Sequence, residues 1–195
     1  MKRLLLALCL LSPAALSQQR SGRFEIGVAL GRSFGGTLAR GSNEYFTRDV
    51  DADTAISKGI RLAYTFDPRW SVELLAQRVD TRFVESGSGV FASKPELGVL
   101  QMRFVEAGAR YAFLPGRFAP FAGAGLGLAV LDPDIPDRRD VRDTQRFAAH
   151  LTAGVKAYLA RWAGLRLDVR PRFVSLSDGH WFTHVDLDGG VFLAF

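Results

Sequence analysis

Charged residues of both signs alternate with apolar residues along several segments of this chain of 195 residues. In segment 165–173, apolar side chains alternate with Arg166, Asp168, Arg170 and Arg172. Side chains that alternate with period two point to opposite faces of a strand, so one face of this segment carries four charges. Burying such a face in an ordinary apolar core is strongly unfavourable. The pattern instead indicates acids and bases that pair with one another in a narrow interior.

The same arrangement recurs along the chain and predicts a network of ion pairs. If the last hairpin turns near Gly179, Arg170 lies opposite Asp188 and Arg172 lies opposite Asp186, so that opposite charges face each other. The predicted network has six acids and six bases: Glu25, Arg61, Glu73, Glu106, Arg110, Lys156, Arg166, Asp168, Arg170, Arg172, Asp186 and Asp188.

Three glycines, Gly123, Gly125 and Gly127, fall on the same inner face, where we expect them to leave room for long arginine side chains from other strands.

Segment 100–104 breaks the regular pattern. Leu100, Met102 and Phe104 fall on the face opposite to the apolar residues of the following strand, 105–113. Either a bulge shifts the register here, or this part of the strand rises above a membrane. In the second case the three side chains predict an apolar cup above the charges. Ordinary packing beneath long loops is the alternative.

The three histidines are candidates for catalysis or metal binding. His150 and Thr152 share an inner face, but a deacylase-like site would need a serine in the place of Thr152, with a carboxylate to orient the imidazole. His180 and His184 would be about 13 Å apart on one strand, too far to share a zinc ion. We therefore interpret His150 as a hydrogen-bonded interior residue and the other two as solvated rim residues. No catalytic residue, metal site or cofactor is predicted.

The amino-terminus has the features of a secretion signal. A basic start at Lys2 and Arg3 precedes an apolar run, 4–11, and a small-x-small site that ends at Ser17. We predict a cleaved signal peptide, 1–17, and a mature domain, 18–195. An uncleaved anchor is disfavoured because a spanning helix needs about 20 apolar residues. Acylation at Cys9, the only cysteine, is disfavoured because the preceding residue is leucine.

The charge balance gives no sign of a nucleic-acid partner. The whole chain has 25 Lys and Arg residues against 20 Asp and Glu residues, and removal of Lys2 and Arg3 leaves 23 bases. The arginines are spread over strands that also carry acids, and no basic stretch is interleaved with stacking aromatic residues.

Eight segments with period two predict eight strands. Their connections alternate between long loops and tight turns, which is typical of up-and-down membrane barrels. Aromatic residues near the strand ends predict a girdle at the turn side, formed by Phe66, Trp70, Tyr111, Phe113, Trp162 and Phe195. The predicted strands are 23–32, 58–66, 70–77, 105–113, 121–130, 147–159, 165–173 and 183–195.

The position of the charges decides which face is inside. The apolar faces carry no charge at mid-strand, as expected for contact with lipid, where a mid-depth Arg or Lys costs about 2–4 kcal/mol. We therefore predict an all-β fold, an eight-stranded antiparallel up-and-down transmembrane β-barrel. A soluble periplasmic barrel, with the faces inverted, is the alternative.

Two stretches resemble a known group of proteins. YTFDPRWSVELLA at 64–76 and ARYAFLPGRFAPFAGAGLGLAV at 109–130 are similar to the strand-turn-strand passages of small OmpW-like and OmpA-like outer-membrane barrels. The terminal VFLAF agrees with this resemblance. It implies a location in the bacterial outer membrane and contact with outer-membrane lipids and lipopolysaccharide. It also implies a carboxy-terminal signal, Val191, Leu193 and Phe195, for the barrel-assembly machinery.

Members of that group serve as minor channels, stress-related envelope proteins, adhesins or anchors. We therefore expect a monomeric, non-enzymatic barrel with a structural or minor permeation role for small molecules, including hydrophobic ones. The first alternative is an adhesin or surface-binding module that acts through extracellular loops at 35–57 and 80–98. The second alternative is a lipid A-modifying enzyme, for which His150 and Thr152 are the only candidates.

Overall fold

The computed structural model describes residues 22–39, 50–85, 96–134, 144–176 and 181–195. The predicted signal peptide and Cys9 lie outside these residues. The described part of the chain contains no helix that is long and apolar enough to cross a membrane. It contains ten strands: β1 (Arg23–Phe34), β2 (Thr37–Ala39), β3 (Val50–Ala52), β4 (Ala55–Thr65), β5 (Trp70–Glu85), β6 (Glu96–Ala112), β7 (Phe118–Asp134), β8 (Thr144–Tyr158), β9 (Ala163–Ser175) and β10 (Trp181–Ala194).

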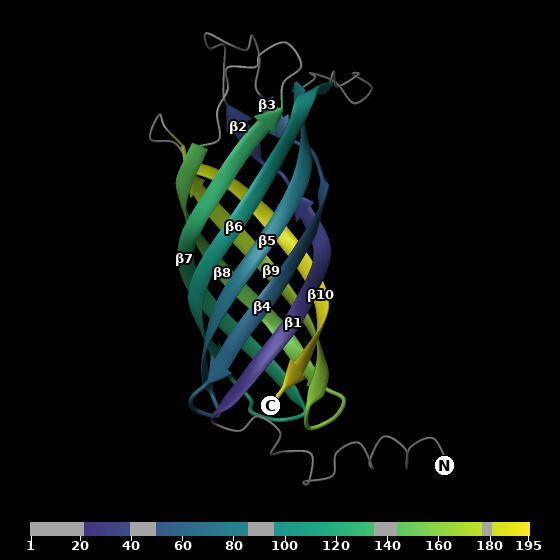
Figure 1. Cartoon of the computed structure of the whole chain (residues 1–195), viewed down its shortest axis with the longest axis vertical. Helices are drawn as coiled ribbons and strands as arrows, with labels where there is room; N and C mark the ends of the chain where they lie inside the picture. Colours follow the sequence, from purple (N-terminus) through teal and green to yellow (C-terminus); the bar gives the residue numbers. More distant parts are fainter. Residues whose placement is uncertain (1–21, 40–49, 86–95, 135–143, 177–180) are drawn as a thin grey trace, which may run out of the picture.

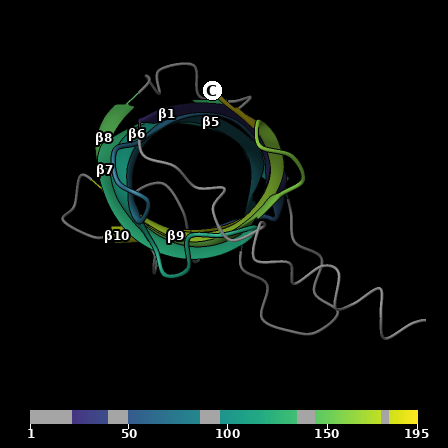
Figure 2. The same cartoon turned by 90° about the horizontal axis from the view of Figure 1, so that it is seen from below.

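The strands form one closed antiparallel sheet (Figures 1 and 2). β1 pairs with β4 on one side and with β10 on the other, which joins the first and last strands and closes the ring. The short strands β2 and β3 follow β1 and precede β4 across two-residue breaks at 35–36 and 53–54. They pair with each other, and β3 also pairs with β5. The wall of the barrel therefore consists of eight long strands, with β2 and β3 as short additions, and the predicted eight-stranded barrel is confirmed.

Burial alternates with period two around the barrel, and the apolar side chains are on the outside. In β1 the buried positions are Glu25, Ala29 and Ser33, whereas Phe24 and Leu30 are about 60% exposed. The same inversion holds in β9, where the arginines are buried and Leu167 is exposed. A barrel with a polar interior and an apolar outer face is suited to lipid, because the hydrocarbon layer then meets only apolar side chains.

The two ends of the barrel differ. The turn end carries the short connections 66–69, 113–117 and 159–162 together with Phe195, and the opposite, loop end carries β2 and β3 (Figure 1). All of the predicted girdle aromatics lie at the turn end. Trp70 and Tyr111 make an edge contact with ring centroids 5.1 Å apart, and Tyr111 also contacts Phe113.

Several strands are longer than their sequence pattern predicts. β5 extends to Glu85 and β6 begins at Glu96, so much of the predicted loop 80–98 is strand. The predicted loop 35–57 contains β2, β3 and the start of β4. Strand pairing continues beyond the region that lipid would cover, where the outer face no longer has to be apolar. The hydropathy pattern therefore ends before the strand does.

Segment 100–104 contains no β-bulge in its pairing with β5. β6 pairs with β5 without a shift from Gly98 to Tyr111, and the irregularity falls near Phe83 and Val84 instead. Leu100, Met102 and Phe104 thus share the inner face with Glu106 and Arg110. The side chains on the inner face of β6 are apolar near the loop end and charged nearer the turn end.

The predicted register of the last hairpin is wrong by two residues. Arg170 pairs with Asp186 and Asp168 pairs with Asp188, while Arg172 lies opposite His184. A shift of two residues keeps every side chain on its own face, so the alternating pattern cannot detect it. Loop length and turn geometry set hairpin register, and residues 177–180 lie outside the described part of the chain.

Charge at mid-strand on the outer face should prevent insertion. We expect Leu167→Arg to lower the free energy of unfolding in liposomes by about 2–4 kcal/mol, because Leu167 faces hydrocarbon. Leu159→Arg makes the same change in an exposed side chain at the turn end and should cost no more than about 1 kcal/mol. The folded fraction, measured from heat-modifiable gel migration, tests this. Equal losses in both variants would contradict the assignment of faces.

Candidate functional site

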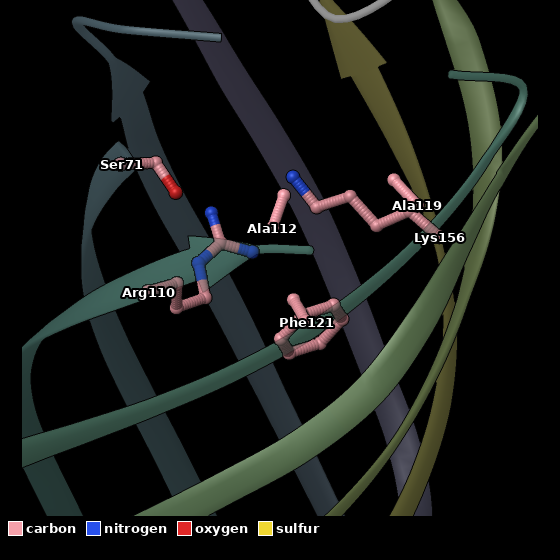
Figure 3. Close-up of a pocket in the computed structure, with 6 residues that line it drawn as sticks. All are labelled: Ser71, Arg110, Ala112, Ala119, Phe121 and Lys156. Carbon is pink, nitrogen blue, oxygen red and sulfur yellow. The ribbon is translucent and has the colours of Figure 1, made fainter. Parts of the chain in front are cut away.

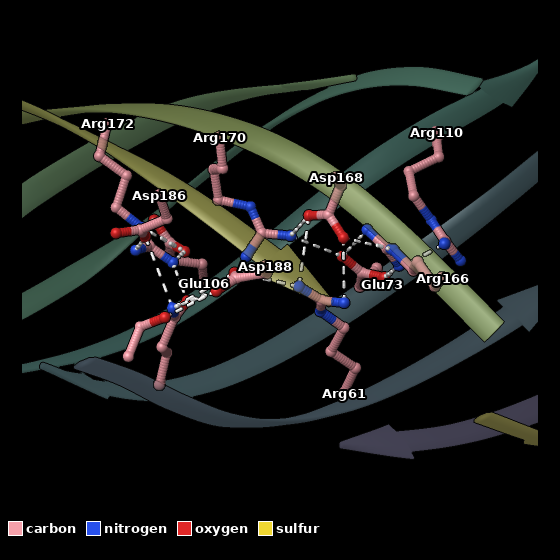
Figure 4. Close-up of polar contacts among 12 residues, drawn as sticks. Arg61, Glu73, Glu106, Arg110, Arg166, Asp168, Arg170, Arg172, Asp186 and Asp188 are labelled. Atoms are coloured by element: carbon pink, nitrogen blue, oxygen red, sulfur yellow. Dashed lines mark hydrogen bonds and ion pairs between the residues drawn. The ribbon is translucent and has the colours of Figure 1, made fainter. Parts of the chain in front are cut away.

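The lumen of the barrel contains all twelve residues of the predicted charge network. None of their side chains points to the outer face, and each residue is at most 7% exposed. They come from β1, β4, β5, β6, β8, β9 and β10. All of them except Glu25 and Lys156 are labelled in Figure 4, where they meet across the lumen. The dense contacts follow from the size of the barrel, because eight strands enclose a space that side chains can fill.

Two carboxylates organise the part of the network nearer the turn end. Glu73 accepts hydrogen bonds from Arg166 and from Arg170, the latter at 3.3 Å, and forms an ion pair with Arg110 at 3.2 Å. Asp168 accepts from Arg166 at 2.9 Å and forms an ion pair with Arg61 at 3.1 Å. Each carboxylate therefore neutralises several guanidinium groups that are removed from water.

One arginine organises the part nearer the loop end. Arg172 donates to both oxygens of Glu106, with its Nη2 2.8 Å from Oε2, and also donates to Asp186 and Gln77. Asp188 links this part to the lower one, because it accepts hydrogen bonds from Gln77 at 3.3 Å and from Arg61 at 3.1 Å.

The turn end of the lumen is closed by a smaller group. Glu25 binds Lys156, accepts a hydrogen bond from Tyr158 at 3.1 Å and lies 3.7 Å from Arg110. The Phe121 ring lies beneath the guanidinium of Arg166, 4.6 Å from its centroid, which adds a cation–π contact.

Two small cavities lie between these side chains. One of about 10 Å³ is lined by Arg110, Lys156, Phe121 and Ser71, together with two alanines (Figure 3). Another of about 20 Å³ lies between Glu25, Glu73 and Arg166. A cavity of this size holds about one water molecule. Both cavities in this part of the lumen are therefore of water size.

The three inner glycines make room for neighbouring side chains, of which only one is an arginine. A Cβ at Gly123 would lie 3.0 Å from Cγ of Arg110, whereas a Cβ at Gly127 would lie 2.9 Å from Cγ of Glu106. A Cβ at Gly125 would lie 2.5 Å from Cε1 of His150. Because these glycines have no side chains, the inner face of β7 accommodates His150 and Glu106 as well as Arg110.

The predicted cup residues are buried near the loop end. Leu100, Met102 and Phe104 are each at most 2% exposed. Phe104 also lies 4.4 Å from the guanidinium carbon of Arg172, so the apolar layer rests directly on the charge network. The cluster contains Ala52, Ala55, Val79, Leu100, Met102, Phe104, Ala129, Ala148, Val174 and Phe182, with Leu131 and Leu176 packed against it.

The sequence interpretation of His184 is wrong. We expected a solvated rim residue, but His184 is 1% exposed and stacks on Phe182, with Phe104 on another side. β10 begins at Trp181, so His184 is already inside the barrel. Its position two residues before Asp186 on an alternating strand was the signal that could have placed it.

His150 lies in the lumen, with Nδ1 3.1 Å from a carboxylate oxygen of Glu106. Thr152 is buried on the same face. Within the described ranges, no group of three or more His, Cys, Asp or Glu residues is arranged to hold a metal ion. His180 lies outside those ranges.

The predicted carboxy-terminal signal lies on the outer face at the turn end. Val191, Leu193 and Phe195 are all exposed. The amide of Phe195 donates to the carbonyl of Phe24 at 2.9 Å, which fixes the last residue against the first strand.

Loss of a shared carboxylate should be costly. Glu73→Gln removes the charge that neutralises Arg110, Arg166 and Arg170, so we expect the free energy of unfolding in urea to fall by about 3–5 kcal/mol. Asp80→Asn is a matched control, because Asp80 pairs with Arg78 on the exposed outer face. It should change stability by no more than about 1 kcal/mol. Similar effects of the two substitutions would show that the network does not hold the barrel together.

Comparisons with known proteins agree with this architecture. The structure is similar to OprG of Pseudomonas aeruginosa, with a TM-score of 0.65 and 16% identity over 92% of this chain and 99% of that one. It is also similar to neisserial surface protein A, with a TM-score of 0.61 and 15% identity over 90% of this chain and 100% of that one.

A third similar structure is the outer membrane protein AlkL in lipid bilayers, with a TM-score of 0.59 and 17% identity over 90% of this chain and 91% of that one. No curated protein sequence matches the chain. The family model for the outer membrane protein beta-barrel domain matches residues 4–192. With its closed ring of strands, charged lumen and apolar outer face, this chain belongs to the family of outer-membrane β-barrel domains.

Proposed function

We propose that this protein is a non-enzymatic, structural barrel of the bacterial outer membrane whose lumen is closed to through passage. The observation that carries the proposal is the charge network, which fills the lumen with buried and mutually paired side chains. A membrane-spanning sheet of this kind supports the envelope and leaves no continuous water path in the described lower lumen.

The contacts also make spontaneous opening of the lumen unfavourable. A solute that moves along the axis must separate Arg166 from Glu73 or Arg172 from Glu106, and either separation leaves a buried charge without its partner. The aromatic ring of Phe121 further narrows the turn end. These contacts support a plug that is part of the fold.

The surroundings of His150 support a non-catalytic role. Both His150 and Thr152 are buried in the lumen, away from the lipid-facing surface that a lipid substrate would approach. Glu106, the carboxylate beside His150, is already engaged by Arg172. A lipid A-modifying reaction would require the lipid to reach His150 and Thr152, and the burial of both residues obstructs this approach.

Electrical recording tests the closed lumen. We expect the purified full chain in planar bilayers to give no ion-conducting steps above those of a protein-free bilayer, because the network leaves no continuous path. A sixteen-stranded porin in the same bilayers shows that the assay detects an open barrel. Reproducible unitary steps from the wild-type chain would refute the closed lumen.

A second candidate function is minor uptake of small apolar molecules, and it rests on the apolar cluster at the loop end. An apolar layer above a charged one offers a site that selects against polar solutes. Beside it, the β8–β9 pairing is interrupted between His150 and Ala153, opposite Pro171. Proline has no N–H to donate to a neighbouring strand, so the pairing between β8 and β9 is weaker there. An apolar molecule in the cluster would then pass between these two strands into the membrane.

Fluorescent probe entry tests this second candidate. If the cluster admits apolar molecules, liposomes with the wild-type chain should take up N-phenylnaphthylamine faster than empty liposomes, and Met102→Gln should remove the difference. Leu75→Gln is a matched control, because Leu75 is also a buried interior residue but lies outside the cluster. Uptake equal to that of empty liposomes would leave only the structural role.

The adhesin alternative stays a prediction. Its two loops include residues 40–49 and 86–95, which lie outside the described part of the chain.

A further inference from the structure

Three cations lie side by side on the outer face of the barrel. Lys58 of β4 pairs in register with Arg78 of β5, and Arg78 pairs with Arg103 of β6. All three side chains are exposed and face away from the lumen. We call Lys58, Arg78 and Arg103 the basic row. Residues directly opposite each other on neighbouring strands are close enough to interact, and like charges in this arrangement are destabilising.

The acids near the basic row do not neutralise it. Arg78 pairs with Asp80 at 2.9 Å, and Arg103 lies 3.7 Å from Asp132. Lys58 has no acidic partner among the residues that the structure describes.

A fourth cation adds to this excess. Arg32 of β1 is exposed on the same outer face and lies two residues beyond Leu30, the register partner of Lys58. Among the described residues, the basic row and Arg32 therefore provide four cations, and the two acids Asp80 and Asp132 contact them.

The height of the basic row places it at the border of the hydrocarbon layer. Along β5, Arg78 lies eight residues from Trp70 of the aromatic girdle. At about 3.3 Å per residue and a tilt of about 40°, this is roughly 20 Å along the membrane normal, close to the height of the apolar band of such barrels. Two residues nearer the turn end, the outer face becomes apolar with Ile60 and Val105.

We propose that the basic row is a binding site for the phosphate groups of lipopolysaccharide in the outer leaflet. The row lies toward the loop end, which faces the cell exterior in barrels of this family. Guanidinium and ammonium groups bind phosphate through charge-assisted hydrogen bonds. The acyl chains of the same lipid would lie against the apolar outer face below the row, where Ile60 and Val105 are exposed. Anionic phospholipid is the competing occupant, and the test separates the two.

This site goes beyond the structural role and does not depend on a closed lumen. It also gives a reason for the register of three like charges. The repulsion between Lys58, Arg78 and Arg103 is removed when a phosphorylated lipid bridges them. The barrel would then gain stability from the leaflet that surrounds it.

The experiment measures binding of purified lipid A to the full chain in detergent by native mass spectrometry. We expect Lys58→Gln/Arg78→Gln/Arg103→Gln to weaken binding of diphosphorylated lipid A about a hundredfold, since each cation near an anionic surface contributes about fivefold. The matched control, Arg69→Gln/Arg117→Gln/Arg161→Gln, removes three cations from the turn end and should retain wild-type binding. Heat-modifiable migration verifies that both variants are folded.

A single variant and a dephosphorylated lipid provide two further tests. Lys58→Gln alone removes the cation without an acidic partner in the described structure, so it should weaken binding about fivefold even if the triple variant fails to fold. Fully dephosphorylated lipid A should bind the wild-type chain as weakly as diphosphorylated lipid A binds the triple variant. Equal binding of the two lipids, equal loss in the turn-end control, no loss in Lys58→Gln, or equally tight binding of phosphatidylglycerol would overturn the assignment.

Discussion

Closure of the sheet is the constraint on which the rest of this structure depends. Hydrocarbon offers no partners for backbone N–H and C=O groups, so a spanning sheet must pair both edges of every strand. Here β1 closes the ring by pairing with β10, and the final residue, Phe195, is hydrogen-bonded to Phe24. Once the ring is closed, each strand has one face toward lipid and one toward a narrow lumen. The apolar residues then belong on the outside, and the charged residues have only one another as partners.

The charges in the lumen balance as a whole but not locally. Nearer the turn end there are five bases, Arg61, Arg110, Lys156, Arg166 and Arg170, against three acids, Glu25, Glu73 and Asp168. Nearer the loop end the single base Arg172 faces Glu106, Asp186 and Asp188, which completes the six of each sign. Arg61 joins the two parts, because it contacts both Asp168 and Asp188. The network therefore acts as one unit, in which loss of a shared partner affects both parts.

The outer surface is divided by height in the same way as the lumen. Aromatic residues ring the turn end, apolar side chains cover the middle, and cations appear toward the loop end. Inside, an aromatic group with Tyr158 and Phe192 lies at the turn end, the charges lie above it, and the apolar cluster with Phe104 lies above the charges. The outer arrangement matches the layers of the membrane, and the inner one brings the charged side chains together between the two apolar layers.

The sequence by itself determined the class of the fold and the face of almost every side chain. Period two is a local property, so the alternation of Arg166 to Arg172 with apolar neighbours assigned the four charges to the lumen without any knowledge of their partners. Tertiary structure alone decided the register of the last hairpin and the true strand ends. It also decided which acid meets which base: Glu73 and Arg166 are 93 residues apart and meet only across the closed barrel. Hydropathy reports which side of a strand faces lipid, whereas contacts across the lumen depend on the stagger and tilt of all the strands together.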